Sequence, residues 1–336
     1  MSDRRRHADA FLHSSGWGAA RRVYLAGDAS DRSYDRLHLN GKTAVLMDAP
    51  PGQGDDPAQF LTIAAHLTGL GLSAPTCIAS DLPHGFLLLE DLGDAIYARQ
   101  LQDEPSNDGL LYGAAVDVLV HIQAHATCAN LPDLSAQDWS DAAAFALDWY
   151  RFAITGDTGK KTNFTTALCD LLQRNANGTR VMILRDFHAE NLLWLPERPG
   201  LARVGLLDFQ LAQLGQPAYD LVSLLQDARR DVPQETERAM KLRFVAAAGV
   251  PSDQFEITYA VLGAQRALRI IGVFARLCLV AGKPAYLPLI PRVWAQLHQN
   301  LAIPALAPLA ELCAELLPPP TPAVLAIIGS KCGHYR

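Results

Sequence analysis

The spacing of apolar positions divides the chain into a strand-rich first part and a helical remainder. Short strand patterns precede residue 92, at 23–25, 33–39, 43–47 and 86–89. Asn40-Gly41 between two of them is a typical hairpin turn. Later apolar positions follow helical spacing, at 110–127, 142–152, 234–248, 254–281, 286–298 and 306–317. Prolines at 318–322 predict an extended tail. This pattern predicts an α+β fold.

A polar segment, Asp186 to Asn191, lies between two apolar runs, and Asp208 ends a further apolar run. A strand–loop–strand hairpin would return Asp208 to the loop that carries Asp186 and Asn191. Metal-dependent phosphoryl transfer uses one carboxylate toward the attacking hydroxyl, and an amide with another carboxylate around Mg²⁺. We therefore predict Asp186 as the catalytic residue, with Asn191 and Asp208 as Mg²⁺ ligands.

Three motifs carry a family resemblance: D-F-H-A-E-N at 186–191, L-D-F-Q at 207–210 and P-A-Y-D-L at 217–221. Together they resemble the aminoglycoside-phosphotransferase and choline-kinase-like family. The resemblance implies a two-lobed, protein-kinase-like fold, with a small, mostly β N-lobe and a large, mostly helical C-lobe. It also implies that Asp220 is the buried acid that braces the catalytic loop. This chain has Leu184-Arg185-Asp186 where the family usually has H-G-D, so the first histidine is missing.

The same resemblance places the lobe boundary near residue 92. The N-lobe at 1–92 would cover the nucleotide, and the C-lobe at 93–336 would carry the catalytic loop and the acceptor site. Backbone groups at Glu90 and Leu92 would read the adenine of ATP. The loop formed by Gly27, Asp28, Ala29 and Ser30 occupies the position that covers the phosphates, although it is not a G-x-G-x-x-G and an ordinary surface turn is the alternative.

One expected ion pair is missing from the sequence. Protein kinases have a lysine on the third strand, paired with a glutamate on the following helix. Here Met47 stands near the lysine position, and the helical segment at 56–70 has no glutamate. We expect Arg32 or Arg36 to supply the cation and assign Arg36 to the nucleotide site. A solvated position on the strand is the alternative for Arg36.

Composition narrows the classes of partner. With 336 residues and 49% hydrophobic content, the chain can bury a sizeable core. A net charge of −6 argues against nucleic acid as the main partner. Six scattered cysteines without a C-x-x-C pair suggest reduced thiols, and no secretory signal or uncharged 18-residue apolar window is present. We expect a cytoplasmic protein that acts on a small molecule away from the membrane, as a monomer or weak homodimer.

The C-terminal part has an uneven charge. Between Glu256 and Glu311 the chain has no acidic residue, but it has five basic ones: Arg266, Arg269, Arg276, Lys283 and Arg292. A cationic acceptor pocket would suit an anionic substrate and not a polycationic aminoglycoside. The candidate acceptor residues are His188, Gln210, Arg266 and Arg269. Solvated arginines, or arginines that brace acidic loops, are an equally open alternative.

Several segments are similar to a bacterial branch of the family, namely L-A-G-D-A-S, V-L-M-D-A-P-P-G and A-Q-R-A-L-R-I-I-G-V-F-A-R-L. That branch phosphorylates N-acetylmuramate and N-acetylglucosamine at C1 during cell-wall sugar recycling. The resemblance implies an ATP- and Mg²⁺-dependent amino-sugar kinase. Two alternatives stay open: a kinase of an amino alcohol or an aminoglycoside, and a non-catalytic nucleotide-binding module.

Overall fold

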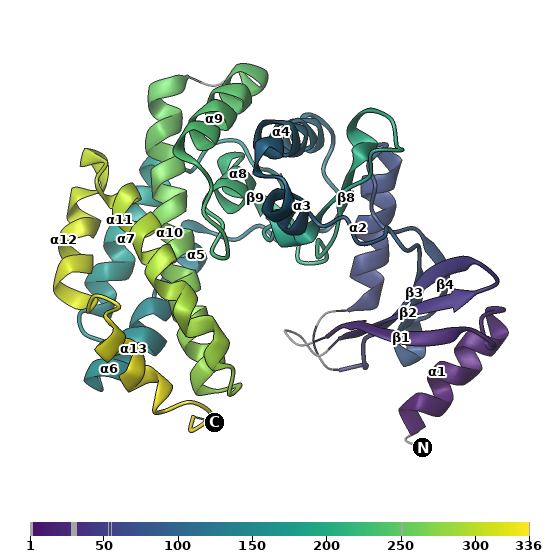
Figure 1. Cartoon of the computed structure of the whole chain (residues 1–336). Helices are drawn as coiled ribbons and strands as arrows, with labels where there is room; N and C mark the ends of the chain where they lie inside the picture. Colours follow the sequence, from purple (N-terminus) through teal and green to yellow (C-terminus); the bar gives the residue numbers. More distant parts are fainter. Residues whose placement is uncertain (1–2, 28–31, 53, 55, 250, 336) are drawn as a thin grey trace. The chain divides into compact units, whose positions relative to one another are not determined.

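The chain divides into two units, each built from two separate stretches of sequence (Figure 1). Unit 1 consists of Met1–Asn130 and Ala189–Ala212, and unit 2 consists of Leu131–His188 and Gln213–Arg336. The computed structural model describes residues 3–27, 32–52, 54, 56–249 and 251–335.

Unit 1 combines a sheet, a hairpin and four helices in its described residues. Its strands are β1 Arg21–Ala26, β2 Ser33–Leu39, β3 Lys42–Asp48, β4 Cys77–Asp81, β5 Phe86–Leu89, β7 Leu192–Trp194 and β8 Val204–Leu206. Its helices are α1 Asp3–Ser14, α2 Pro57–Gly69, α3 Tyr97–Asp103 and α4 Asp108–Ala124.

The first five strands form an antiparallel sheet in the order β1-β2-β3-β5-β4. Asn40 and Gly41 have positive φ angles of 50° and 76°, as a two-residue hairpin turn requires, so the predicted turn is confirmed. The sequence analysis missed the edge strand β4. Its residues are mostly exposed and include Ser80 and Asp81, so they lack the alternation that marks a half-buried strand.

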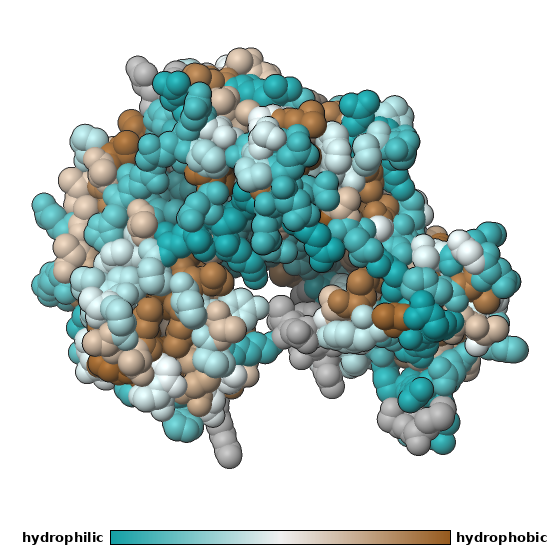
Figure 2. Space-filling view, viewed as in Figure 1, coloured by the Kyte–Doolittle hydropathy of each residue, from teal (hydrophilic) through white to brown (hydrophobic). Residues whose placement is uncertain are grey.

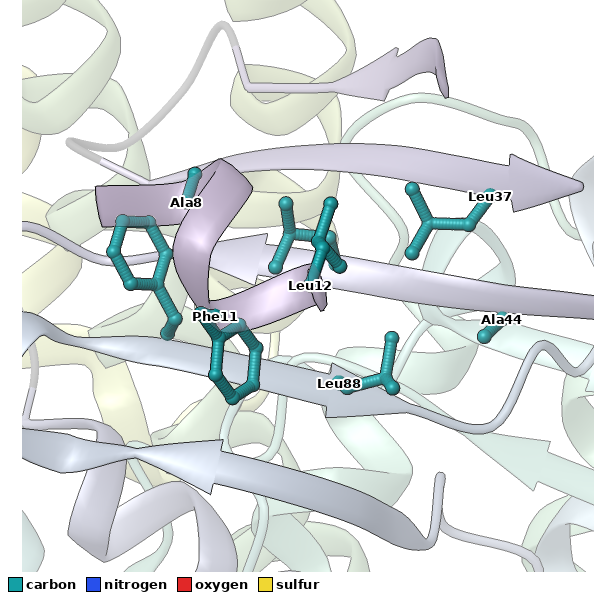
Figure 3. Close-up of a cluster of buried hydrophobic side chains, with 8 residues drawn as sticks. Ala8, Phe11, Leu12, Leu37, Ala44 and Leu88 are labelled. Atoms are coloured by element: carbon teal, nitrogen blue, oxygen red, sulfur yellow. The ribbon is translucent and has the colours of Figure 1, made fainter. Parts of the chain in front are cut away.

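Helix α1 covers one face of this sheet (Figure 3). Ala8, Phe11 and Leu12 pack there against buried residues of β2, β3 and β5, namely Leu37, Ala44, Leu46, Phe86 and Leu88. The Phe11 and Phe86 rings stack with their centroids 5.9 Å apart. Since side chains of a strand alternate between faces, the intervening residues Met47 and Leu87 are buried on the opposite face.

The β7–β8 hairpin is held to the rest of unit 1 by its backbone. The Leu206 N–H donates to the Ser73 carbonyl at 2.8 Å, and the Trp194 N–H donates to the Ala95 carbonyl at 2.8 Å. These two bonds fix both strands of the hairpin against segments that lie far earlier in the sequence.

Unit 2 is predominantly helical, with α10 in contact with most of its other helices (Figure 1). Its helices are α5 Ala136–Ala143, α6 Phe152–Thr155, α7 Lys161–Asn175, α8 Ala218–Leu225, α9 Gln234–Ala248, α10 Ser252–Leu279, α11 Ile290–Leu301, α12 Ala307–Leu316 and α13 Pro322–Gly329. The short strands β6 Val181–Ile183 and β9 Gln213–Gly215 pair antiparallel.

Two predicted elements of unit 2 differ from the structure. The helix expected at 142–152 is divided among α5, a π-helical segment at Ala146–Arg151 and α6. The extended tail expected at 318–322 leads into α13. Thr321 caps that helix, because its side chain accepts from the Val324 N–H at 3.3 Å. Pro322 at the first helical position favours helix initiation, so this proline run begins a helix.

Helix α10 also contains the most apolar long stretch among the described residues. Gln254–Leu279 has the length and composition of a membrane span, but 78% of its apolar window is buried inside the fold. It therefore has the features of a core helix. On the face shown in Figure 2, apolar residues form small patches surrounded by hydrophilic ones.

Removing a buried leucine of α1 is expected to weaken unit 1 far more than removing an exposed one. Leu12 is 3% exposed and Leu110 on α4 is 54% exposed. Leu12→Ala should lower the free energy of unfolding by about 2–5 kcal/mol, since it leaves a cavity against the sheet. The matched variant Leu110→Ala should change it by about 0.5 kcal/mol or less. Urea unfolding measures both, and equal effects would contradict the packing described.

Candidate active site

The register of the β7–β8 hairpin brings Asn191 and Asp208 to the same end of unit 1. Leu192 pairs with Leu206, and the Leu207 N–H donates to the Asn191 carbonyl at 2.9 Å. Asp208 follows Leu207 directly, so it lies one residue beyond the partner of Asn191. The prediction was a hairpin that returns Asp208 to the loop carrying Asp186 and Asn191, and the register bears on Asn191 alone.

The Asp208 carboxylate is held by two neighbours in unit 1. The Gln210 side-chain amide donates to Asp208 Oδ1 at 2.9 Å, and an Arg32 guanidinium nitrogen lies 3.3 Å from the same oxygen. Asp208 itself has φ 55°, a left-handed conformation that Asp tolerates better than most residues. Its side chain is 43% exposed, so the carboxylate is accessible to a ligand.

The donor set at this end of the hairpin fits Mg²⁺. This ion prefers oxygen ligands and is usually bound by one or two carboxylates together with substrate phosphates and water. Asp208 would contribute a carboxylate and Asn191, as predicted, an amide oxygen. Among the described residues, no group of three or more His, Cys, Asp or Glu side chains forms a complete metal cage. A site of this kind therefore needs phosphate oxygens to complete it.

The segment after β5 carries the backbone groups predicted to read adenine, and its residues Glu90, Asp91 and Leu92 are half-buried. The Glu90 N–H donates to the Thr76 carbonyl at 2.8 Å, so the predicted adenine contacts of this segment are the Glu90 carbonyl and the Leu92 N–H. The Glu90 side chain is bound elsewhere, to Arg198 and Thr76. The prediction that Glu90 contacts adenine therefore concerns its backbone and not its side chain.

Of the residues assigned from the sequence to the nucleotide phosphates, the structure describes only Gly27 and Arg36. Gly27 directly follows β1 and is the last described residue before a gap. Asp28, Ala29 and Ser30 lie outside the described residues. Arg36 on β2 has its guanidinium in ion pairs with Asp91 and Asp94, each at 2.8 Å. These contacts hold β2 to the segment after Glu90, so Arg36 is engaged in a structural contact.

In unit 2, Asp220 at the start of α8 braces the chain next to Asp186. Its carboxylate accepts from the Leu184 N–H at 2.6 Å and from the Arg185 N–H at 2.9 Å. Burial raises the pKa of Asp220 to about 7, while the two N–H donors act in the opposite direction. The acid thus contacts the backbone of the predicted catalytic loop, as the family resemblance implied.

The predicted acceptor residues are divided between the units. His188, Arg266 and Arg269 lie in unit 2 with Asp186, whereas Gln210 lies in unit 1 and contacts Asp208. Asp186 and Asn191 also fall in different units, since the boundary is between His188 and Ala189. The convergence of Asp186 with Asn191 and Asp208 therefore stays a prediction.

The two arginines of α10 that were predicted to contact the acceptor, Arg266 and Arg269, differ in burial and in hydrogen bonding. Arg266 is buried, and donates to Ser223 Oγ at 2.9 Å and to the Gln226 carbonyl at 3.2 Å. Arg269 is half-buried. Tyr219 raises the pKa of Arg269, and the charge of Asp186 acts in the same direction. Arg266 thus braces the end of α8, whereas Arg269 retains some exposure near Asp186.

The sequence analysis missed Asp227, a buried acid beside this group. Its side chain accepts from the Arg229 N–H at 2.8 Å, and its second oxygen has no hydrogen-bond partner among the described residues. Burial lowers the pKa of the nearby His188, although the charge of Asp227 acts to raise it. The signal was the polar run Q-D-A-R-R-D directly after an apolar helix.

Comparison with known proteins identifies the family. Residues 22–258 match the sequence profile of the phosphotransferase enzyme family. The chain belongs to this family. An N-acetylmuramate/N-acetylglucosamine kinase of Caulobacter vibrioides is 38% identical, over 92% of this chain and 95% of its own length. A kinase of the same name from Pseudomonas aeruginosa is 35% identical, over 90% of this chain and 91% of its own.

Solved structures agree on the fold of this phosphotransferase. A choline/ethanolamine kinase family protein from Mesorhizobium loti has a TM-score of 0.61 at 12% identity, with 97% of this chain and 99% of that chain covered. An aminoglycoside phosphotransferase in a ternary complex with ADP and hygromycin B has a TM-score of 0.56 at 14% identity, with 88% and 98% covered. The predicted protein-kinase-like fold is therefore confirmed.

The buried acid gives a prediction about pH. Because the pKa of Asp220 is about 7 when folded and 3.8 as a free acid, unfolding releases a proton between these values. The contribution of Asp220 to the free energy of unfolding should therefore fall as pH rises from about 4 to about 7, by at most about 4 kcal/mol. Asp220→Asn should lack this slope. Urea unfolding of both proteins across this range measures the difference, and parallel pH profiles would contradict it.

Proposed function

We propose that this phosphotransferase is an ATP- and Mg²⁺-dependent sugar kinase that phosphorylates the anomeric hydroxyl of N-acetylmuramate and N-acetylglucosamine. The observation that carries the chemistry is the hairpin register that sets Asn191 beside Asp208. The names and high coverage of the two bacterial relatives support the choice of acceptor. A role in recycling cell-wall sugars in the cytoplasm, as a monomer or weak homodimer, is part of the same proposal.

Unit 1 would bind the nucleotide. The Glu90 carbonyl and the Leu92 N–H would pair with the adenine edge, and the connection that follows Gly27 would lie over the phosphates. Asn191 and Asp208 would hold Mg²⁺, and Gln210 would keep the Asp208 carboxylate in place. Bound Mg²⁺ supplies neutralisation of the phosphate charge.

Asp186 would orient the anomeric hydroxyl and accept its proton as the phosphoryl group is transferred. An anomeric hydroxyl is more acidic than an ordinary alcohol, so the demand on the base is modest. Positioning matters most in such a reaction, because the loose transition state needs little covalent assistance. The two bonds from Asp220 to Leu184 and Arg185 would fix the backbone that presents Asp186.

Unit 2 would supply the acceptor contacts. N-acetylmuramate carries a carboxylate that N-acetylglucosamine lacks, and a guanidinium is a suitable partner for it. Arg269 is the better candidate, since it keeps some exposure whereas Arg266 is buried against Ser223 and Gln226. His188 would hydrogen-bond near the loop in its neutral form, because burial lowers its pKa.

The alternatives are an amino-alcohol or aminoglycoside kinase and a non-catalytic nucleotide-binding module. Incubating the protein with ATP, Mg²⁺ and each of N-acetylmuramate, N-acetylglucosamine, choline and kanamycin separates them. We expect sugar 1-phosphates, identified by ³¹P NMR, from the two amino sugars only. Asp186→Asn should stay folded and bind nucleotide, with turnover about 10²–10⁴-fold lower because the base is lost. Phosphorylation of choline or kanamycin instead, or near-normal turnover of the variant, would contradict this proposal.

Arg269→Gln tests the acceptor contact. If the guanidinium binds the carboxylate, KM for N-acetylmuramate should rise about tenfold or more, while KM for N-acetylglucosamine stays within about twofold. Arg174→Gln is the matched control, since Arg174 on α7 is exposed and pairs with Asp170 at 3.4 Å. Equal changes for both sugars would assign Arg269 a structural role.

A further inference from the structure

Arg32 stands at the base of the connection between β1 and β2. Ala26 pairs with Tyr34, so the two strands are still adjacent where the connection leaves them. A Cβ added to Gly27 would lie 3.1 Å from the Arg32 carbonyl, so the backbone closes tightly there. The Arg32 side chain is buried, with 6% exposed, and it reaches Asp208.

The contact between Arg32 and Asp208 is an ion pair of moderate length. The guanidinium nitrogen lies 3.3 Å from Asp208 Oδ1, whereas a short charge-assisted bond is about 2.7–2.9 Å. The Gln210 amide, at 2.9 Å, is the closer donor to the same oxygen. A buried cation is thus kept beside a carboxylate that fits Mg²⁺, in the same unit as the predicted adenine contacts.

Two other arginines near the predicted adenine contacts at 90–92 form ion pairs with residues other than Asp208. Arg36 pairs with Asp91 and Asp94, and Arg198 binds Glu90. Arg32, by contrast, forms an ion pair with Asp208. Met47, on the third strand, is fully buried and carries no charge.

We propose that Arg32 binds the nucleotide phosphates, and that it takes the role that a third-strand lysine has in protein kinases. This inference rests on the proposed kinase function. Without nucleotide, Arg32 neutralises Asp208. A triphosphate brings a much larger negative charge, and the planar guanidinium suits bidentate contact with phosphate oxygens. Arg32 then turns from the carboxylate to the phosphates, and Asp208 becomes available to the metal.

Nucleotide affinity tests this role without relying on turnover. Isothermal titration calorimetry of Arg32→Gln with ATP, ADP and adenosine, each in EDTA and in Mg²⁺, compares ligands that differ only in phosphate. Kd for ATP and ADP should rise about 10–100-fold, as expected for loss of a charge-assisted contact, and Kd for adenosine should stay within about twofold. Arg32→Lys should recover part of the affinity, because lysine restores the positive charge but cannot make the bidentate contact of a guanidinium.

Arg22→Gln is the matched control in the same sheet. Arg22 pairs with Asp35 at 2.6 Å and with Asp9 at 3.2 Å, so its loss should leave all three affinities unchanged. Thermal melts establish that each variant is folded, and Arg32→Lys carries the test if Arg32→Gln does not fold.

The outcomes separate this inference from the function on which it rests. Unchanged ATP affinity in Arg32→Gln, or an equal loss for adenosine, would overturn the role of Arg32 and leave the kinase proposal intact. Tighter Mg²⁺ binding with unchanged ADP affinity in EDTA would show that Arg32 only neutralises Asp208. If Arg32→Gln loses affinity for ATP and ADP but not for adenosine, and the wild-type protein phosphorylates neither amino sugar, the role of Arg32 is supported and the proposed acceptor is refuted. A wild-type protein that binds no ATP would overturn both.

Discussion

The hydrogen bond from the Leu207 N–H to the Asn191 carbonyl is the contact on which the candidate metal site depends. This bond sets the backbone of Asn191 opposite Leu207, and a slip of one residue in the hairpin would shift Asp208 along the strand relative to Asn191. Three paired residues on each strand are few to fix a register by themselves. The backbone hydrogen bonds from Leu206 to Ser73 and from Trp194 to Ala95 help to fix the register, because each holds one strand of the hairpin to a separate segment of unit 1.

A comparable constraint acts on the loop that carries Asp186. Arg185 has φ 71°, a left-handed conformation that costs roughly 1–2 kcal/mol for a residue with a Cβ. It occupies the position where the family usually has glycine. Asp220 receives the N–H groups of Leu184 and Arg185, and these bonds hold the strained residue in place. The departure from the H-G-D pattern is therefore offset locally by the buried acid.

Much of this arrangement was predictable from sequence because it depends on local signals. The Asn40-Gly41 turn and the hairpin before Asp208 both follow from short patterns whose geometry is nearly fixed. The choice between Arg32 and Arg36 was not predictable. Arg36 lies within β2 and Arg32 directly before it. What separates them is an ion-pair partner far away in the sequence: Asp91 for Arg36 and Asp208 for Arg32. Ion pairs between residues so far apart in the sequence depend on tertiary packing, which a local sequence pattern does not predict.

The missing lysine–glutamate pair also has a structural counterpart. In protein kinases that pair couples the helix after the third strand to the nucleotide site. Here α2 reaches the site through Phe60, whose ring stacks on Phe209 with centroids 4.9 Å apart. Phe209 follows Asp208 directly, so an apolar contact positions the residue next to the proposed metal ligand. If Arg32 binds the phosphates as proposed, the two tasks of one ion pair are divided: aromatic packing couples the helix, and the residue directly before β2 supplies the charge.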